Sequence, residues 1–156
     1  MQIASRQEFA ASPTDTHAML TDPAFLTLSA KRLGAERQEV TADAAATRVV
    51  ASMPAPSEVR TFIGGRMDVV QESTWGPAAP DGSRTGTFRF AVSGAPVELT
   101  CVTRLAPIGT GSVVDYTGTL TVKIPLVGPM VEKTAAPAVL ESLAAQESAA
   151  ADWLAR

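Results

Sequence analysis

Gly118-Thr-Leu-Thr-Val-Lys-Ile-Pro-Leu-Val-Gly-Pro-Met130 is the stretch of sequence that decides the fold. Its first half alternates apolar and polar residues as far as Ile124, which predicts a strand. Pro125 ends this pattern because proline cannot donate a hydrogen bond to a sheet, and an Ala-rich pattern of helical period then continues to Leu154. A long helix that follows a sheet needs an apolar surface to lie on. The sequence therefore predicts one terminal helix packed on a sheet, a geometry that can enclose a cavity.

Strand patterns precede this stretch along most of the chain. Four consecutive runs (67–75, 83–93, 97–105 and 114–123) each place apolar residues on one face and polar residues on the other. Such runs predict an antiparallel meander with one solvated face, on which Arg89, Arg104 and Glu98 should lie. Shorter strand patterns cover residues 2–9 and two runs between 35 and 54, split near 42–43. The predicted sheet has about six to seven strands.

Two short helices are predicted between the first strand and the rest of the sheet. Ser12-Pro13 and Asp22-Pro23 both combine a capping side chain with a proline suited to the first helical turn. The first helix should run from about Pro13 to Thr21, and the second should end at Gly34. Residues 57–63 allow either a helical turn or an irregular strand.

The terminal helix is predicted to bury one stripe of residues. That stripe contains Leu126, Met130, Thr134, Leu140, Leu143, Glu147 and Leu154. Glu132, Lys133, Glu141 and Gln146 should point away from it. Pro137 should kink the helix because it removes one backbone hydrogen bond.

Composition limits the classes of function. The 156 residues fit a single domain spanning 1–156, with net charge -3 and no basic run longer than Lys31-Arg32, so no nucleic-acid partner is expected. Cys101 is the only cysteine, which favours a reducing, cytoplasmic location. No apolar stretch has membrane-spanning or signal-peptide length, so no integral membrane contact is expected. One histidine and one cysteine cannot form a structural metal site, and no metal or cofactor is expected.

The order of elements resembles the START-like helix-grip fold, the superfamily of birch-pollen-allergen-like proteins and polyketide cyclases also called SRPBCC. The resemblance rests on Ser12-Pro13 through Leu20, on Trp75, and on the strand and loop from Gly118. More narrowly, Leu126-Val-Gly-Pro-Met-Val-Glu-Lys133 and the terminal 147–154 segment are similar to an uncharacterised actinobacterial family of that superfamily. The resemblance implies an α+β fold, in which a curved antiparallel sheet surrounds a long C-terminal helix. It also implies an apolar cavity, in which superfamily members bind lipids, sterols, polyketides or plant hormones and some catalyse cyclisation or dehydration.

The candidate site residues are those expected to face this cavity. His17, Gln71 and Tyr116 are the polar candidates, although His17 on a helix surface and Tyr116 as an ordinary core tyrosine are the simpler interpretations. Cys101 is expected to be a buried, inert thiol. The apolar candidates either line a pocket or simply fill the core. The full set is His17, Leu20, Gln71, Trp75, Phe88, Phe90, Leu99, Cys101, Tyr116, Leu120, Met130, Thr134 and Leu143.

The sequence therefore predicts binding of an apolar small molecule or lipid, in a carrier, sensor or storage role. Two alternatives stay open. One is an enzyme of the cyclase, dehydratase or hydrolase type, with His17 as the acid–base group and no other catalytic residue assigned. The other is an interaction module that meets a protein partner through a sheet edge or an open mouth. A homodimer also stays open, because nothing in the sequence indicates the oligomeric state.

Overall fold

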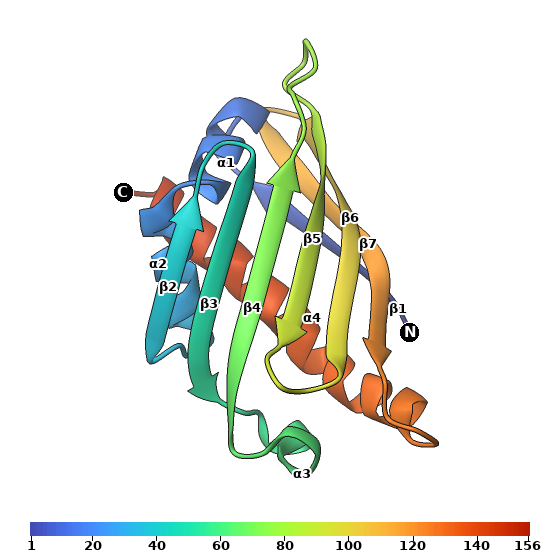
Figure 1. The fold of residues 1–156 in the computed structure, drawn as a ribbon. Coiled ribbons are helices and arrows are strands. Elements are labelled where there is room, and N and C mark those ends of the chain that lie inside the picture. Colours follow the sequence, from blue (N-terminus) through green and yellow to red (C-terminus); the bar gives the residue numbers. More distant parts are fainter.

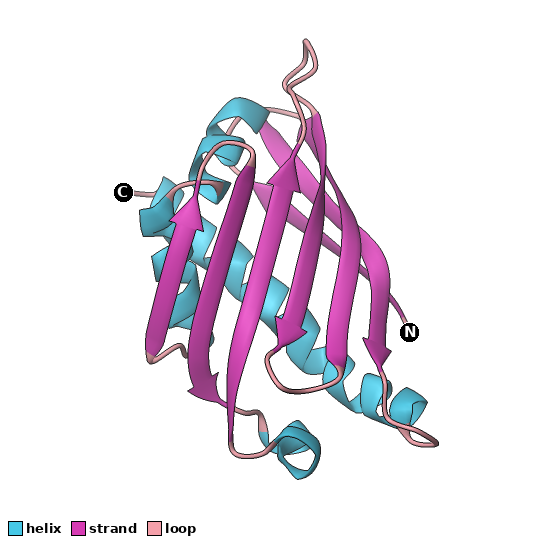
Figure 2. Ribbon diagram, in the orientation of Figure 1, coloured by secondary structure: helices cyan, strands magenta, loops and turns pink.

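The computed structural model describes residues 1–156. Seven antiparallel strands form one sheet in the order β1-β7-β6-β5-β4-β3-β2, which curves over the long helix α4 (Figures 1 and 2). This is the helix-grip arrangement that was predicted. The strands are β1 (Gln2–Phe9), β2 (Arg37–Ala42), β3 (Ala46–Pro54), β4 (Arg66–Trp75), β5 (Arg84–Val92), β6 (Val97–Ile108) and β7 (Gly111–Val122). The helices are α1 (Pro13–Leu20), α2 (Pro23–Leu33), the short turn η1 (Ser57–Val59), α3 (Arg60–Ile63) and α4 (Gly128–Leu154).

The two short helices begin and end as the sequence predicts. The Ser12 hydroxyl accepts a 3.1 Å hydrogen bond from the Asp15 backbone N–H, and a carboxylate oxygen of Asp22 accepts a 2.8 Å bond from the Ala24 N–H. Gly34 ends α2 with φ 108°, a left-handed conformation that favours glycine. Residues 57–63 form η1 and α3, so this segment is helical and not an irregular strand.

The outer face of the sheet is solvated and charged, as the alternation indicates. Arg89 bridges Glu72 and Glu98 across neighbouring strands, at 2.9 and 3.2 Å. All three side chains are partly exposed, so this network adds little to stability. These groups belong to the surface and not to the interior.

Two glycines allow neighbouring strands to approach closely on the curved sheet. A Cβ added to Gly118 of β7 would lie 1.8 Å from the Thr100 carbonyl oxygen, and one added to Gly86 of β5 would lie 1.9 Å from that of Thr74. No other residue fits either position without moving the backbone. Glycine within a strand often marks such a close approach or bend.

The buried face of α4 differs from the predicted stripe. It consists of small residues and a few larger ones, namely Gly128, Val131, Ala135, Ala136, Val139, Ser142, Leu143, Ala149 and Ala150. Leu126 is fully exposed in the loop before the helix, and Met130 is 56% exposed, so their predicted inward placement is wrong. The prediction chose the largest apolar residues, whereas the helix turns its alanines and valines toward the sheet. α4 continues on both sides of Pro137, and the predicted kink stays a prediction.

None of the helices combines the length and the hydrophobicity that a membrane-spanning helix needs.

Candidate functional site

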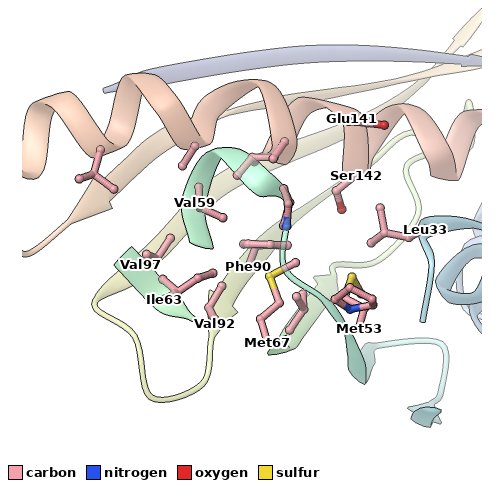
Figure 3. A pocket seen from close by; sticks show the side chains of 17 residues that line it. Leu33, Met53, Val59, Ile63, Met67, Phe90, Val92, Val97, Glu141 and Ser142 are labelled. Carbon is pink, nitrogen blue, oxygen red and sulfur yellow. The ribbon is translucent and has the colours of Figure 1, made fainter. Parts of the chain in front are cut away.

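A hollow of about 270 Å³ lies between α4 and the inner face of the sheet (Figure 3). Its wall is mostly hydrophobic, with thirteen apolar residues among seventeen. Strands contribute Met53, Pro54, Met67, Val69, Phe90, Val92 and Val97; α4 contributes Val131, Ala135, Ala138, Val139, Glu141 and Ser142; and Leu33, Pro56, Val59 and Ile63 complete the wall. We call this space the apolar cavity.

The segment between β3 and β4 forms part of the cavity wall. β3 ends at Pro54, and Pro56 follows two residues later; neither residue has a backbone N–H to donate, so the strand does not continue. The Nε atom of Arg60 donates a 3.0 Å hydrogen bond to the Ala55 carbonyl and so ties α3 to the preceding loop. The side chains of Val59 and Ile63 then face the cavity (Figure 3).

Only two polar side chains belong to the wall of the apolar cavity, and both come from α4. Ser142 is buried, and its hydroxyl oxygen accepts a 3.0 Å hydrogen bond from the Gln71 side-chain amide. Glu141 is exposed, so it lies where the cavity wall meets solvent. The wall contains no lysine, arginine or histidine.

Several of the predicted site residues surround a different and much smaller space. Leu20, Gln71, Trp75, Phe88 and Tyr116 line a gap of about 20 Å³, together with Gln146 and four other residues. A gap of this size holds at most about one water molecule. The aromatic side chains therefore fill this part of the interior, and the larger empty space lies elsewhere.

Tyr116 belongs to a buried hydrogen-bond network that joins α4 to the sheet. The Gln146 amide donates to the Tyr116 hydroxyl at 2.9 Å and to the Gln7 side-chain oxygen at 3.0 Å. Gln7 in turn donates to the Leu143 carbonyl. Burial raises the pKa of Tyr116 to about 12. The prediction that Gln146 points away from the core is wrong, because its amide is needed to pair these buried polar groups.

His17 is buried but lies on the wall of neither space. Its Nε2 atom lies 2.8 Å from the Ala44 carbonyl oxygen, and its ring packs edge-on against Trp75 at a centroid distance of 6.0 Å. Burial lowers the pKa of His17. These contacts tie α1 to the turn between β2 and β3.

The remaining predicted residues are divided between the cavity, the core and the surface. Phe90 alone among the candidates lines the apolar cavity. Leu99, Cys101, Leu120 and Leu143 are buried in the core without lining either space, and burial raises the pKa of the Cys101 thiol to about 11. Thr134 is half-buried, and its hydroxyl donates to the Met130 carbonyl within α4. Neither Met130 nor Thr134 lines the cavity, because α4 turns its smaller side chains inward.

The cavity residues that sequence reasoning missed come from every part of the wall: α2, β3, β4, the segment between these two strands, β5, β6 and α4. Met53 and Met67 occupy facing positions on neighbouring strands, and Val59 and Ile63 follow the Pro54-Ala-Pro56 break. The alternation of β3 and β4 identified the inner face. The alternation did not show which part of that face is covered by aromatic side chains and which part lines the cavity.

A family model described as "Protein of unknown function (DUF2505)" matches residues 4–154. The chain belongs to this family. No curated protein matches the sequence.

Solved structures share the fold over nearly the whole chain. A STAR-related lipid transfer protein from Xanthomonas axonopodis is 19% identical with a TM-score of 0.65, covering 99% of this chain and 86% of its own. The protein TTHA0849 from Thermus thermophilus is 20% identical with a TM-score of 0.63, covering 97% and 98%. A START superfamily protein from Mycobacterium smegmatis is 17% identical with a TM-score of 0.57, covering 97% and 98%. The fold is therefore START-like, as the sequence predicted.

Proposed function

We propose that this protein binds an apolar small molecule, or the apolar end of a lipid, in the cavity between α4 and the sheet. The observation that carries the proposal is the apolar cavity of about 270 Å³, walled mainly by aliphatic side chains and Phe90. Water makes few hydrogen bonds in such a space. An apolar ligand, in contrast, gains about 25 cal/mol of binding free energy for each Å² of apolar surface that is removed from water. The structural similarity to a lipid transfer protein supports the same class of ligand.

The volume of the cavity limits what it can enclose. An apolar cavity of about 150 Å³ holds benzene, which has six non-hydrogen atoms, so the same ratio gives about eleven for this cavity. A ligand of that size fits entirely, and a longer lipid places one segment inside while the rest extends outward. The role is then to carry, sense or store that molecule.

Binding is favoured over catalysis by the chemistry of the wall. Acid–base catalysis needs a titratable group within hydrogen-bond reach of the reacting atoms. His17, the candidate for that role, lies outside the wall and is engaged with Ala44, and Glu141 at the rim is the only titratable side chain that the wall contains.

Titration with n-butylbenzene, which has about ten non-hydrogen atoms, tests the proposal directly. We expect a dissociation constant of about 10 to 100 µM, in the range of good ligands of that size. Ala135→Leu places three extra carbons in the cavity and should weaken binding at least about tenfold, because the added side chain occupies the ligand's space. Isothermal titration calorimetry measures both affinities.

Ala144→Leu is the matched control, because Ala144 is exposed on the same helix and does not line the cavity. Its affinity should equal that of the original protein. Failure of the original protein to bind, or binding by Ala135→Leu with undiminished affinity, would show that the cavity is not the site. Native mass spectrometry of freshly purified protein adds a search for a bound apolar molecule.

A further inference from the structure

Ser142 is the one polar group buried in the wall of the apolar cavity. A serine hydroxyl has one proton to donate and two lone pairs to accept with. The bond from the Gln71 amide uses one lone pair of Ser142, and no group of the protein accepts the hydroxyl proton. Gln71 therefore fixes the position of this oxygen, and its proton and second lone pair are left for a ligand. A hydroxyl or carbonyl group is the complementary partner.

The charges around the cavity disfavour ligands with a carboxylate head group. Glu141 is the only charged side chain of the wall, and it carries the same sign as a carboxylate. Arg60 lies in the neighbouring α3, but its Nε atom bonds to the Ala55 carbonyl and the residue is not part of the wall. A carboxylate deep in the cavity would be buried without a cation, which is strongly unfavourable. A carboxylate at the rim would meet the negative charge of Glu141.

We infer that the cavity selects uncharged amphiphiles, namely apolar molecules that carry one hydroxyl or carbonyl group, and rejects carboxylates such as free fatty acids. This inference rests on the proposed function and adds the class of head group to it. Ser142, held by Gln71, recognises the polar group of the ligand. Glu141 disfavours anions at the entrance.

Three probes that differ only in the head group test the selectivity. They are n-butylbenzene, 4-phenylbutan-1-ol and 4-phenylbutanoate, titrated at pH 8, where the acid is ionised. We expect the alcohol to bind at least as tightly as the hydrocarbon, since its hydroxyl exchanges a hydrogen bond with water for one with Ser142. The carboxylate should bind at least about tenfold more weakly than the alcohol, since it loses solvation without gaining a cation.

Two variants assign this selectivity to its residues. Ser142→Ala should weaken binding of the alcohol about fivefold, the effect of one neutral hydrogen bond, and leave the hydrocarbon affinity unchanged. Glu141→Gln should strengthen binding of the carboxylate about threefold to fivefold and leave the alcohol unchanged. Glu58→Gln removes the same charge from an exposed residue of η1 outside the wall, and it should change none of the affinities.

The outcomes separate this inference from the proposed function. If the hydrocarbon does not bind, the proposed function fails and the inference fails with it. If the hydrocarbon binds and the carboxylate binds as tightly as the alcohol, only the selectivity is overturned. Should Ser142→Ala fail to fold, the comparison of the three probes on the unmodified protein still decides the question.

Discussion

The side-chain amide of Gln146 lies 2.9 Å from the hydroxyl of Tyr116 and donates a hydrogen bond to it. Gln146 belongs to α4 and Tyr116 to β7, so this bond joins the C-terminal helix to the inner face of the sheet. The same amide also donates to Gln7 of β1. One side chain thereby supplies a hydrogen-bond donor to the Tyr116 hydroxyl of β7 and to the Gln7 side-chain oxygen of β1.

Replacement of Gln146 by leucine should therefore destabilise the protein. The change removes two hydrogen bonds and leaves the Tyr116 hydroxyl and the Gln7 side-chain oxygen without this donor, at a cost of about 1–3 kcal/mol in the free energy of unfolding. Urea denaturation measures the loss. Gln2→Leu is the control, because the Gln2 amide makes one exposed bond to Thr119, and it should cost less than about 0.5 kcal/mol. Equal effects of the two changes would contradict a structural role for the network.

His17 should make the free energy of unfolding depend on pH, with a decrease that begins as the pH falls below about 7. Burial lowers its pKa in the folded protein below the usual value of about 6.5. The unfolded chain therefore binds the proton more readily, and the stability due to neutral His17 is complete above about pH 6.5 and is lost as the pH falls toward the folded pKa. Urea denaturation at several pH values should show unfolding free energy falling in this range.

His17→Gln is the matched variant for this measurement. Glutamine can donate a hydrogen bond toward the Ala44 carbonyl but does not titrate, so its stability should stay nearly constant from pH 7 to pH 5. An equally steep fall in the variant would assign the effect to other groups.

Tyr116 should resist ionisation in the folded protein. Its pKa is raised to about 12 by burial, and it is the only tyrosine, so absorbance at 295 nm reports this residue alone. Little phenolate should form up to about pH 11 in the folded state, whereas the urea-unfolded chain should titrate near pH 10. The stability due to the neutral phenol is complete below pH 10 and is lost as the pH rises toward 12. Half-ionisation near pH 10 without unfolding would contradict the buried position.

Leu126 carries a backbone strain that glycine should relieve. Its φ angle is 70° and its side chain is fully exposed, so the leucine bears the cost of the left-handed conformation without burying apolar surface. Leu126→Ala removes the side chain but keeps the strain, whereas Leu126→Gly removes both. We expect the glycine variant to be about 1 kcal/mol more stable than the alanine variant in thermal or urea unfolding. Equal stability would show that the loop relaxes in the alanine variant.

The order and type of the elements could be predicted because their signals are local. The caps at Ser12 and Asp22 are satisfied by backbone groups two or three residues away, and Gly34 adopts the conformation that ends a helix. Alternation along each strand likewise depends only on which residues are apolar. Such signals depend little on the rest of the fold, and the structure has helices and strands where they indicate.

The orientation of α4 could not be predicted from the same kind of signal. The helix contains apolar residues around much of its circumference, and the sequence favoured Met130 for the core because it is large. The structure instead buries Ala135 and Ala149, and it turns Gln146 inward to reach Tyr116. Which face is buried depends on how closely the helix approaches the sheet, and that distance is a property of the packed protein.

By itself, the sequence determined a START-like sheet gripping one long helix, and it determined which face of each strand is apolar. Only the tertiary structure decided that Trp75 and Phe88 fill one part of the interior while a cavity remains beside Phe90, Met53 and Ala135. The reason is physical. The alternation of apolar and polar residues along a strand shows which face of the sheet each side chain occupies. The volume of a cavity depends instead on how side chains from distant segments pack together, and this packing exists only in the folded chain.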